Sequence, residues 1–304
     1  MKPASRPMDS SLKSARMAAS TSGLVLAADA AIDLQLHTTH SDGTWAPAQL
    51  IDYLLNEQFA LAAITDHDRP DSVVSVLQLG AERGLHLLTA VEMSTSWRGE
   101  ATDVLCYGFA ADQPGWNDLL SLAQSVVLRQ NEITREVYEK LLRAGYEFPQ
   151  EGEVLKAKAG EPLGSNDLGL LLLHHGYSTG PGSIGRIMTD AGFYFAQNDI
   201  AVVVDAAHRS GALCLIAHPG RGGEFTRFDG GLLDELRGEV PIDGIEAYYP
   251  KHTPEQVAMY LDYARRHDLL VSSGSDSHGP EKAPIKYRAE LSRQLLERLG
   301  IRVE

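Results

Sequence analysis

The short apolar runs of this chain end repeatedly in a histidine or a carboxylate. The segments HTTHSD, TDHD and SDSH each follow such a run. The residues in this position are His37, His40, Asp42, Asp66, His67, Asp68, Glu92, His218, Glu246, Asp276 and His278, and Asp103 opens another apolar run. In parallel βα folds the carboxyl ends of the strands form one common face, where ligands bind. We therefore expect these side chains, distant in sequence, to converge.

The pattern from Ala31 onward predicts an α/β fold. Short β-branched or leucine-rich runs alternate with stretches of helical period, as in successive βα units around a parallel sheet. The strand candidates are the runs 31–36, 61–65, 86–93, 103–109, 212–218, 242–249 and 269–275. These runs make a closed or distorted barrel plausible, and a chain of 304 residues is long enough to bury its core.

One stretch interrupts the alternation. Between about Pro114 and Asn198, apolar residues recur at helical spacing, and Gly and Pro cluster between the helical segments. The predicted organisation is a disordered tail at 1–30, barrel segments at 31–112 and 199–288, a helical insertion at 113–198, and a C-terminal helix at 289–304. The tail is rich in Ser, Ala, Lys and Arg, a composition that a transit peptide would share.

Charge and composition exclude several kinds of partner. The formal net charge of −14 repels polyanions, so a nucleic-acid duplex is not expected to bind. A small phosphorylated ligand remains compatible, because bound cations reverse the local field. The two cysteines, Cys106 and Cys214, lie in apolar runs, and no apolar run is long enough to span a membrane. We expect a cytoplasmic protein, and the sequence leaves its oligomeric state open.

Many histidines and carboxylates at strand ends favour a metal site. Crowded carboxylates repel one another, and divalent cations bridged by Asp or Glu remove that repulsion while neutral imidazoles complete the coordination. A lone histidine at a strand end is more often hydrogen-bonded than bound to metal. The combination at five strand ends, with three tight polar segments, favours the metal interpretation.

The ordered motifs IDLQLHTTHSDG, AITDHD, AVEMS, LIAHPGR and SSGSDSH resemble those of the PHP family (polymerase and histidinol phosphatase). The resemblance covers about residues 31–280. It is strongest to the branch of small-nucleotide phosphoesterases, which includes nucleoside 3′,5′-bisphosphate phosphatases and a 5′-to-3′ exoribonuclease activity. The resemblance implies a distorted (β/α)7 barrel of the PHP type with a helical insertion and a centre of two or three divalent metal ions.

The resemblance also implies a ligand set. The implied metal ligands are His37, Asp42, His67, Glu92, His218, Asp276 and His278, with Glu92 bridging. Three positions depart from the family pattern, since Gln35, Asp103 and Asp167 stand where the family has histidine. Gln35 and Asp103 remain possible oxygen ligands, which would shift the preference from zinc toward manganese, iron or magnesium. His40 either compensates for Gln35 or has no ligand role.

The implied activity is hydrolysis of a phosphate ester by a metal-bound hydroxide. The substrate would be a small phosphorylated metabolite or nucleotide, for example a nucleoside 3′,5′-bisphosphate, or a short oligonucleotide. Arg221, directly after AHPG, is the candidate phosphate clamp, with a surface arginine as the alternative. Lys251 and His252 are candidates for a second phosphate contact or a proton donor, with a solvated loop as the alternative.

Two other functions stay open at this stage. The absence of histidine at positions 35, 103 and 167 is compatible with a catalytically impaired PHP-like barrel that binds metal or phosphorylated ligands without turnover. An amidohydrolase-type enzyme also has a barrel with metal ligands at the ends of its strands. It ranks lower because such sites usually carry a bridging lysine, and no lysine ends a predicted strand here.

Overall fold

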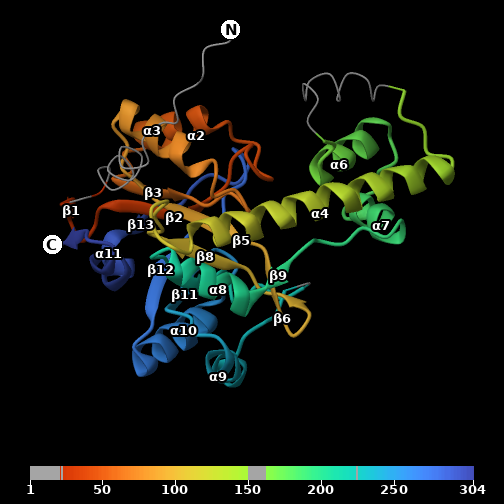
Figure 1. Cartoon of the computed structure of the whole chain (residues 1–304). Helices are drawn as coiled ribbons and strands as arrows, with labels where there is room; N and C mark the ends of the chain where they lie inside the picture. The colour runs from red at the N-terminus through yellow and green to blue at the C-terminus, as the bar shows by residue number, and fades with distance from the viewer. Residues whose placement is uncertain (1–20, 22, 150–161, 224) are drawn as a thin grey trace, which may run out of the picture. The chain divides into compact units, whose positions relative to one another are not determined.

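The computed structural model describes residues 21, 23–149, 162–223 and 225–304, so most of the predicted tail at 1–30 lies outside the described residues. The chain divides into two compact units. Unit 1 comprises the described residues of Met1–Ala123 and Asn198–Glu304, and unit 2 comprises those of Gln124–Gln197. Unit 1 contains the sheets, and unit 2 is helical (Figure 1).

Two sheets form the centre of unit 1. The first has the order β13-β2-β3-β4, with bounds β2 Ala31–Leu36, β3 Leu61–Ile64, β4 Leu87–Leu88 and β13 Tyr287–Arg288. The second has the order β12-β11-β10-β8-β5, with bounds β5 Ala90–Met93, β8 Val104–Tyr107, β10 Leu213–Ile216, β11 Gly244–Tyr248 and β12 Leu270–Ser273. The fold is therefore a mixed α/β fold, as the alternating sequence pattern predicted.

Two isolated backbone bridges join the edges of these sheets. Leu36, at the end of β2, pairs in parallel with Ser277, just beyond β12. His67, just beyond β3, pairs in parallel with Glu92 of β5. Both bridges lie next to the polar strand ends that the sequence singled out.

The sequence pattern suggested a parallel sheet, but the observed sheets also contain antiparallel pairs. Strand β8 runs antiparallel to both β5 and β10, and Val104 at its start pairs with Ile216 at the end of β10. The physical reason is the short connection from β5, which allows an antiparallel return but is too short for a helical crossover. Asp103 precedes β8, so it lies at the same edge as the residues that end the parallel strands.

Alternate residues of the strands enter two different cores. In β8, Val104 and Cys106 pack with the helices, while Leu105 and Tyr107 pack with residues such as Leu34 and Leu215 of other strands. This alternation follows from the two-residue period of a strand. The helices that cover unit 1 are α2 Pro47–Asn56, α3 Val73–Arg83, α8 Ile200–Arg209, α9 Gly230–Glu239 and α10 Pro254–His267.

Local sequence signals set the ends of these helices. Asp199 precedes α8, and its carboxylate accepts hydrogen bonds from the backbone N–H groups of Ala201 and Val202. Thr253 precedes α10 in a capping box with Gln256, and the helix opens on a proline. Gly84 ends α3 with a φ of 86°, a left-handed conformation that glycine adopts without strain.

Three small elements complete unit 1. Strands β6 Thr95–Trp97, β7 Glu100–Ala101 and β9 Asn198–Asp199 form a separate sheet. Strand β1 Val25–Leu26 pairs in parallel with β14 Arg302–Val303, although 1–30 was predicted to be disordered throughout. The predicted C-terminal helix at 289–304 is a 3-10 turn Ala289–Ser292, a short helix α11 Arg293–Arg298 and then β14. Gly300, with a φ of 83°, separates α11 from β14.

Unit 2 has an apolar core of its own. Helix α4 Trp116–Arg143 begins in unit 1 and continues through unit 2, which also contains α6 Ser165–His174 and α7 Ser183–Asp190. The buried core residues of unit 2 are Val126, Ile133, Val137, Leu141, Phe148, Leu168, Leu171, Leu172, Met188 and Ala196. Across the described residues, no helix has both the length and the hydrophobicity that a membrane span requires.

Candidate metal centre

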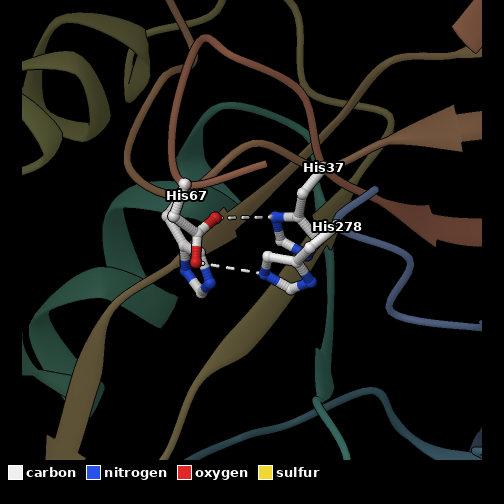
Figure 2. A group of neighbouring side chains, drawn as sticks. His37, His67 and His278 are labelled. Atoms are coloured by element: carbon white, nitrogen blue, oxygen red, sulfur yellow. Dashed lines mark hydrogen bonds and ion pairs between the residues drawn. The ribbon is translucent and has the colours of Figure 1, made fainter. Parts of the chain in front are cut away.

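Most of the predicted ligands converge at one edge of unit 1. His37 follows β2, His67 follows β3, Glu92 lies in β5, and both Asp276 and His278 follow β12. Figure 2 shows the imidazole rings of His37, His67 and His278 gathered together, and the rings of His37 and His278 stack with centroids 4.1 Å apart. The ring of His37 also stacks on that of His67 at 4.8 Å.

Glu92 lies at the centre of this cluster and is fully buried. Its Oε2 lies 3.1 Å from Nε2 of His37 and 3.7 Å from Nε2 of His67, and its Oε1 lies 3.1 Å from Nε2 of His218. Burial opposes ionisation, but His67 and the other imidazoles hold the pKa of Glu92 well below its usual value. Two oxygens of an ionised carboxylate that face different histidines can bridge two cations.

Two aspartates complete the cluster. Oδ1 of Asp276 lies 3.4 Å from Nε2 of His37, and Oδ2 accepts a hydrogen bond from the Tyr249 hydroxyl at 3.3 Å. Oδ2 of Asp42 lies 3.0 Å from Nε2 of His278, and Oδ1 lies 3.6 Å from Nδ1 of His37. His37 therefore has a carboxylate near each of its ring nitrogens.

The potential ligand atoms fall into three overlapping groups. Within each group the atoms lie no more than 4.8 Å apart. The groups are His37, Asp42, His67 and His278; His37, Glu92 and Asp276; and His67, Glu92 and Asp103. His218 lies outside these groups but contacts Glu92, which belongs to two of them.

Several buried polar atoms of the cluster make no hydrogen bond. They are both ring nitrogens of His37, Nδ1 of His67 and Oε1 of Gln35. A buried polar atom without a hydrogen bond costs about 1–3 kcal/mol, and a bound ion would remove this cost. Imidazole nitrogens and carboxylate oxygens at these separations fit divalent cations, and the residues present therefore suit the metal centre that the motifs imply.

The pKa values of the cluster reflect the same crowding of charge. Burial lowers the pKa of His67, but Glu92 and Asp42 outweigh this effect and raise it to about 9. Burial and then the neighbouring Glu92 raise the pKa of Asp103 to about 6. In the metal-free chain, protons balance part of the negative charge, and ligation by His67 requires that its proton leave.

Two residues at the same edge have a strained backbone. His218 has a φ of 31° and Asp276 a φ of 53°, both in the left-handed region that non-glycine residues rarely adopt. The backbone N–H of His218 donates to Oε2 of the buried Glu246 at 2.9 Å, which holds this conformation. Strained residues of this kind occur mainly at functional sites, where surrounding contacts stabilise them.

The three departures from the family motif lie in different places. Nε2 of Gln35 donates to Oε2 of Glu92 at 3.0 Å, so its amide points into the cluster, and Asp103 lies in a ligand group with His67 and Glu92. Asp167 lies in unit 2, where its Oδ2 accepts the backbone N–H of Gly164 at the start of α6. His40 belongs to none of the ligand groups found in the described residues.

Arg221 lies beside the cluster. Its guanidinium lies over the ring of Phe225 at 4.3 Å, and that ring packs edge-on against His218 with centroids 5.1 Å apart. Burial, followed by repulsion from Arg221 and Lys282, lowers the pKa of Lys251. Three cationic side chains therefore influence one another next to Asp276.

Two residues of this region were not predicted from the sequence. Nζ of Lys282 donates to the backbone carbonyl of Asp276 at 2.6 Å and lies 3.6 Å from its Oδ2, and Tyr249 bonds the same carboxylate. Lys282 follows His278 by four residues, and Tyr249 is the last residue of the predicted strand run 242–249. Only their proximity in sequence to candidate site residues could have pointed to them.

His252 has both ring nitrogens engaged by the backbone. Its Nε2 accepts the N–H of Gly220 at 3.0 Å, and its Nδ1 donates to the carbonyl of Ala247 at 3.0 Å. The side chain is 9% exposed. This geometry favours a positioning role for His252, which ties the AHPG loop to β11, over a role as proton donor.

Comparison with known proteins agrees with this geometry. No protein-family model matches the chain. It is 27% identical over 252 residues to a 5′-3′ exoribonuclease of Haemophilus influenzae, which covers 82% of this chain and 90% of the relative. It is 27% identical to a phosphoribosyl 1,2-cyclic phosphate 1,2-diphosphodiesterase of Eggerthella lenta (81% and 94% covered) and to a 3′,5′-nucleoside bisphosphate phosphatase of Chromobacterium violaceum (82% and 87%).

Two solved structures share the fold. One is titled an amidohydrolase of Chromobacterium violaceum with bound sulfate, and it superposes with a TM-score of 0.71 at 24% identity over 88% of this chain and 97% of the other. The other is named as a metal-dependent phosphoesterase of Bifidobacterium adolescentis, with a TM-score of 0.70 at 22% identity over 91% and 97%.

The fold and the cluster define an α/β protein with groups of histidines and carboxylates that could hold divalent cations. Together with the ordered motifs, the relatives support a phosphoesterase of the PHP family.

Proposed function

We propose that this protein is a metal-dependent phosphoesterase that hydrolyses a phosphate ester of a small phosphorylated substrate. One observation carries the proposal: three ligand groups overlap around the buried Glu92, and imidazole nitrogens in them lack hydrogen-bond partners. Two or three divalent cations would account for these atoms and for the crowding of carboxylates.

The residues that would hold the cations are those of the cluster. They are His37, Asp42, His67, Glu92, His218, Asp276 and His278, with Gln35 and Asp103 as oxygen ligands. When bound, divalent cations neutralise phosphate oxygens and make bound water acidic enough to act as a nucleophile near neutral pH. Oxygen ligands at Gln35 and Asp103 favour Mn²⁺, Fe²⁺ or Mg²⁺ over Zn²⁺.

The chain itself would bind and orient the phosphate. Arg221 is held by Phe225 beside His218, and its planar guanidinium can bind two phosphate oxygens at once. Lys251 and Lys282 add positive charge on the side of Asp276. These three cations oppose the net charge of −14 locally, which lets an anionic substrate approach.

The substrate class follows from the relatives together with this cation group. A nucleoside 3′,5′-bisphosphate offers one phosphate to the metal centre and a second to the lysines. The relatives include a bisphosphate phosphatase, a cyclic phosphate diphosphodiesterase and exoribonucleases, so nucleotides and short oligonucleotides are the first substrates to test.

We also propose that the two sheets of unit 1 close into the distorted seven-stranded barrel of the PHP type. The support is the pair of isolated bridges, one between the ends of β2 and β12 and one between the ends of β3 and β5. With these joins, β2, β3, β5, β8, β10, β11 and β12 follow one another in a ring. Residues 124–197 would be the inserted helical domain of this barrel.

The test is turnover by the purified protein loaded in turn with Mn²⁺, Fe²⁺, Mg²⁺ and Zn²⁺. Phosphate release from a nucleoside 3′,5′-bisphosphate is expected, with phosphodiesters and phosphomonoesters as the comparison panel. His67→Ala should abolish release, whereas His86→Ala, which changes an exposed histidine of unit 1, should leave it unchanged. A metal-loaded, folded protein that binds these ligands and turns none of them over would instead establish the impaired, ligand-binding alternative.

A further inference from the structure

A second cluster of potential metal ligands lies away from the Glu92 centre. It consists of His208 near the end of α8, Cys214 in β10, and Asp243 just before β11. His218 and the other candidate ligands lie beyond the carboxyl ends of the strands, whereas Cys214 and Asp243 lie toward the amino ends of β10 and β11. The two clusters share no residue.

The geometry of this cluster brings three different donors together. A ring nitrogen of His208, Sγ of Cys214 and a carboxylate oxygen of Asp243 lie within 4.8 Å of one another. Oδ2 of Asp243 lies 2.8 Å from Nε2 of His208 and accepts the backbone N–H of Cys214 at 2.7 Å. These hydrogen bonds hold the carboxylate between the ring and the strand.

The three side chains of the cluster differ in their exposure to solvent. The Cys214 side chain is fully buried, while those of His208 and Asp243 are 30% and 26% exposed. A cation can therefore arrive from solvent at the imidazole and the carboxylate and meet the sulfur on the inner side. The buried position also keeps competing water away from the sulfur.

We propose that His208, Cys214 and Asp243 form a second divalent-cation site that takes Zn²⁺ or a cation of similar softness. Sulfur and imidazole nitrogen favour Zn²⁺ over the harder Mg²⁺ and Mn²⁺. As the sulfur–metal bond forms, the Cys214 thiol releases its proton to solvent, and His208 binds as the neutral imidazole in place of its contact with Asp243. Water completes the tetrahedral coordination.

The site is structural in character. It joins the end of α8, the start of β10 and the loop that leads into β11, three segments that the chain must hold together on the outer face of the sheet. The chain has two cysteines, and the candidate ligands of the Glu92 centre include none. Metal–thiolate bonding in this protein therefore reports on Cys214 or Cys106.

Cobalt(II) binding provides the test, because cobalt bound to a thiolate has an intense near-ultraviolet charge-transfer band. The full-length protein is stripped of metal, reduced and titrated with Co²⁺. We expect the band to appear and to reach the intensity of about one cobalt–thiolate centre per chain, while cobalt bound at the Glu92 centre adds nothing to it. Cys214→Ser should abolish the band, and His208→Gln, a change at a partly exposed position, should weaken Co²⁺ binding at this site by on the order of tenfold or more.

Cys106→Ser is the matched control, since Cys106 is equally buried and pairs directly with Cys214 across β8 and β10. It should keep the band, and so should Glu92→Gln, which changes only the other centre. Folded wild-type protein that shows no band at saturating Co²⁺, or a band that survives Cys214→Ser, would overturn the proposal. Circular dichroism confirms folding, and phosphate release tests the Glu92 centre separately.

Discussion

Glu92 and Glu246 are both fully buried glutamates in strands of the same sheet, yet their surroundings shift their pKa values in opposite directions. Imidazoles surround Glu92 and keep it ionised despite its burial. Burial raises the pKa of Glu246 well above its usual value, and the nearby carboxylates Glu92 and Asp276 add to this rise. The lowered pKa favours the carboxylate form of Glu92, which can bind cations, and the raised pKa favours the neutral form of Glu246, which accepts the His218 backbone N–H.

This contrast predicts different outcomes for the same substitution. Glu92→Gln removes the central negative charge. The affinity for metal should therefore fall by more than the roughly 10- to 100-fold that is typical when a residue hydrogen-bonded to a metal ligand is changed, and phosphate release should be lost. Glu246→Gln keeps an oxygen acceptor for the N–H of His218, so metal content should change little. Metal analysis after gel filtration measures both, and equal losses in the two variants would contradict the assignment of charge.

Gln35 offers a second prediction at this scale. Its amide lies against Glu92, where the family motif has an imidazole. Gln35→His should raise the affinity for Zn²⁺ relative to Mn²⁺ on the order of tenfold, because imidazole is the softer ligand. Competition between the two ions, followed by metal analysis, measures this ratio. An unchanged ratio would show that residue 35 does not contact a cation.

At the scale of elements, His252 joins two segments that each carry part of the site. It bonds Gly220 in the loop after β10 and Ala247 within β11. A side chain at Gly220 would collide with the His252 ring and with Gln256, which explains the glycine of the AHPG motif. The position of Arg221 therefore depends on a neutral His252.

This junction should be sensitive to acid. Burial lowers the pKa of His252 below the ordinary imidazole value of about 6.5, and a protonated ring could no longer accept the Gly220 N–H. The unfolded chain takes up the proton near pH 6.5 and the folded chain only at lower pH. The contribution of His252 to stability is therefore complete above pH 6.5 and falls as the pH drops toward the lowered folded-state pKa.

His252→Asn should lower the free energy of unfolding by about 1–3 kcal/mol at pH 7.5, since two buried hydrogen bonds are lost. The difference between wild type and variant should shrink as the pH falls below 6.5. Urea unfolding at a series of pH values measures it, and His86→Asn, at an exposed position, serves as the control. A difference that grows toward acid pH would contradict a neutral ring.

The sequence predicted the α/β class and the convergence of His37, His67, Glu92 and Asp276, because each strand end carries its polar residue within a few positions. It could not predict the direction of β8, which depends on pairing with two strands distant in sequence. Lys282 was missed for a different reason. Its role comes from a loop conformation, and loops carry no periodic signal.

At the scale of the whole molecule, the chain has separate apolar cores. Leu168 belongs to the core of unit 2, whose members all lie between Val126 and Ala196, and the candidate ligands lie in unit 1. Contacts that stabilise one unit need not pass through the core of the other. Local stability is therefore expected to differ between the two units.

Leu168→Ala removes a fully buried side chain and should destabilise unit 2 by about 2–5 kcal/mol. Leu173→Ala, at a position that is 49% exposed in the same helix, should have little effect. Hydrogen exchange should accelerate within 124–197 in the first variant only, while metal content stays unchanged. Equal acceleration in both units would show that they unfold as one.

The backbone joins between the two sheets fall at positions 36, 67, 92 and 277, and two of these are candidate ligands while the others adjoin one. Cations bound by these residues would add metal–ligand bonds to the backbone pairing at both joins. Metal supply would then govern the lifetime of the folded chain as well as its chemistry, and a cell starved of the ion would lose the protein to proteolysis before it accumulated an idle enzyme.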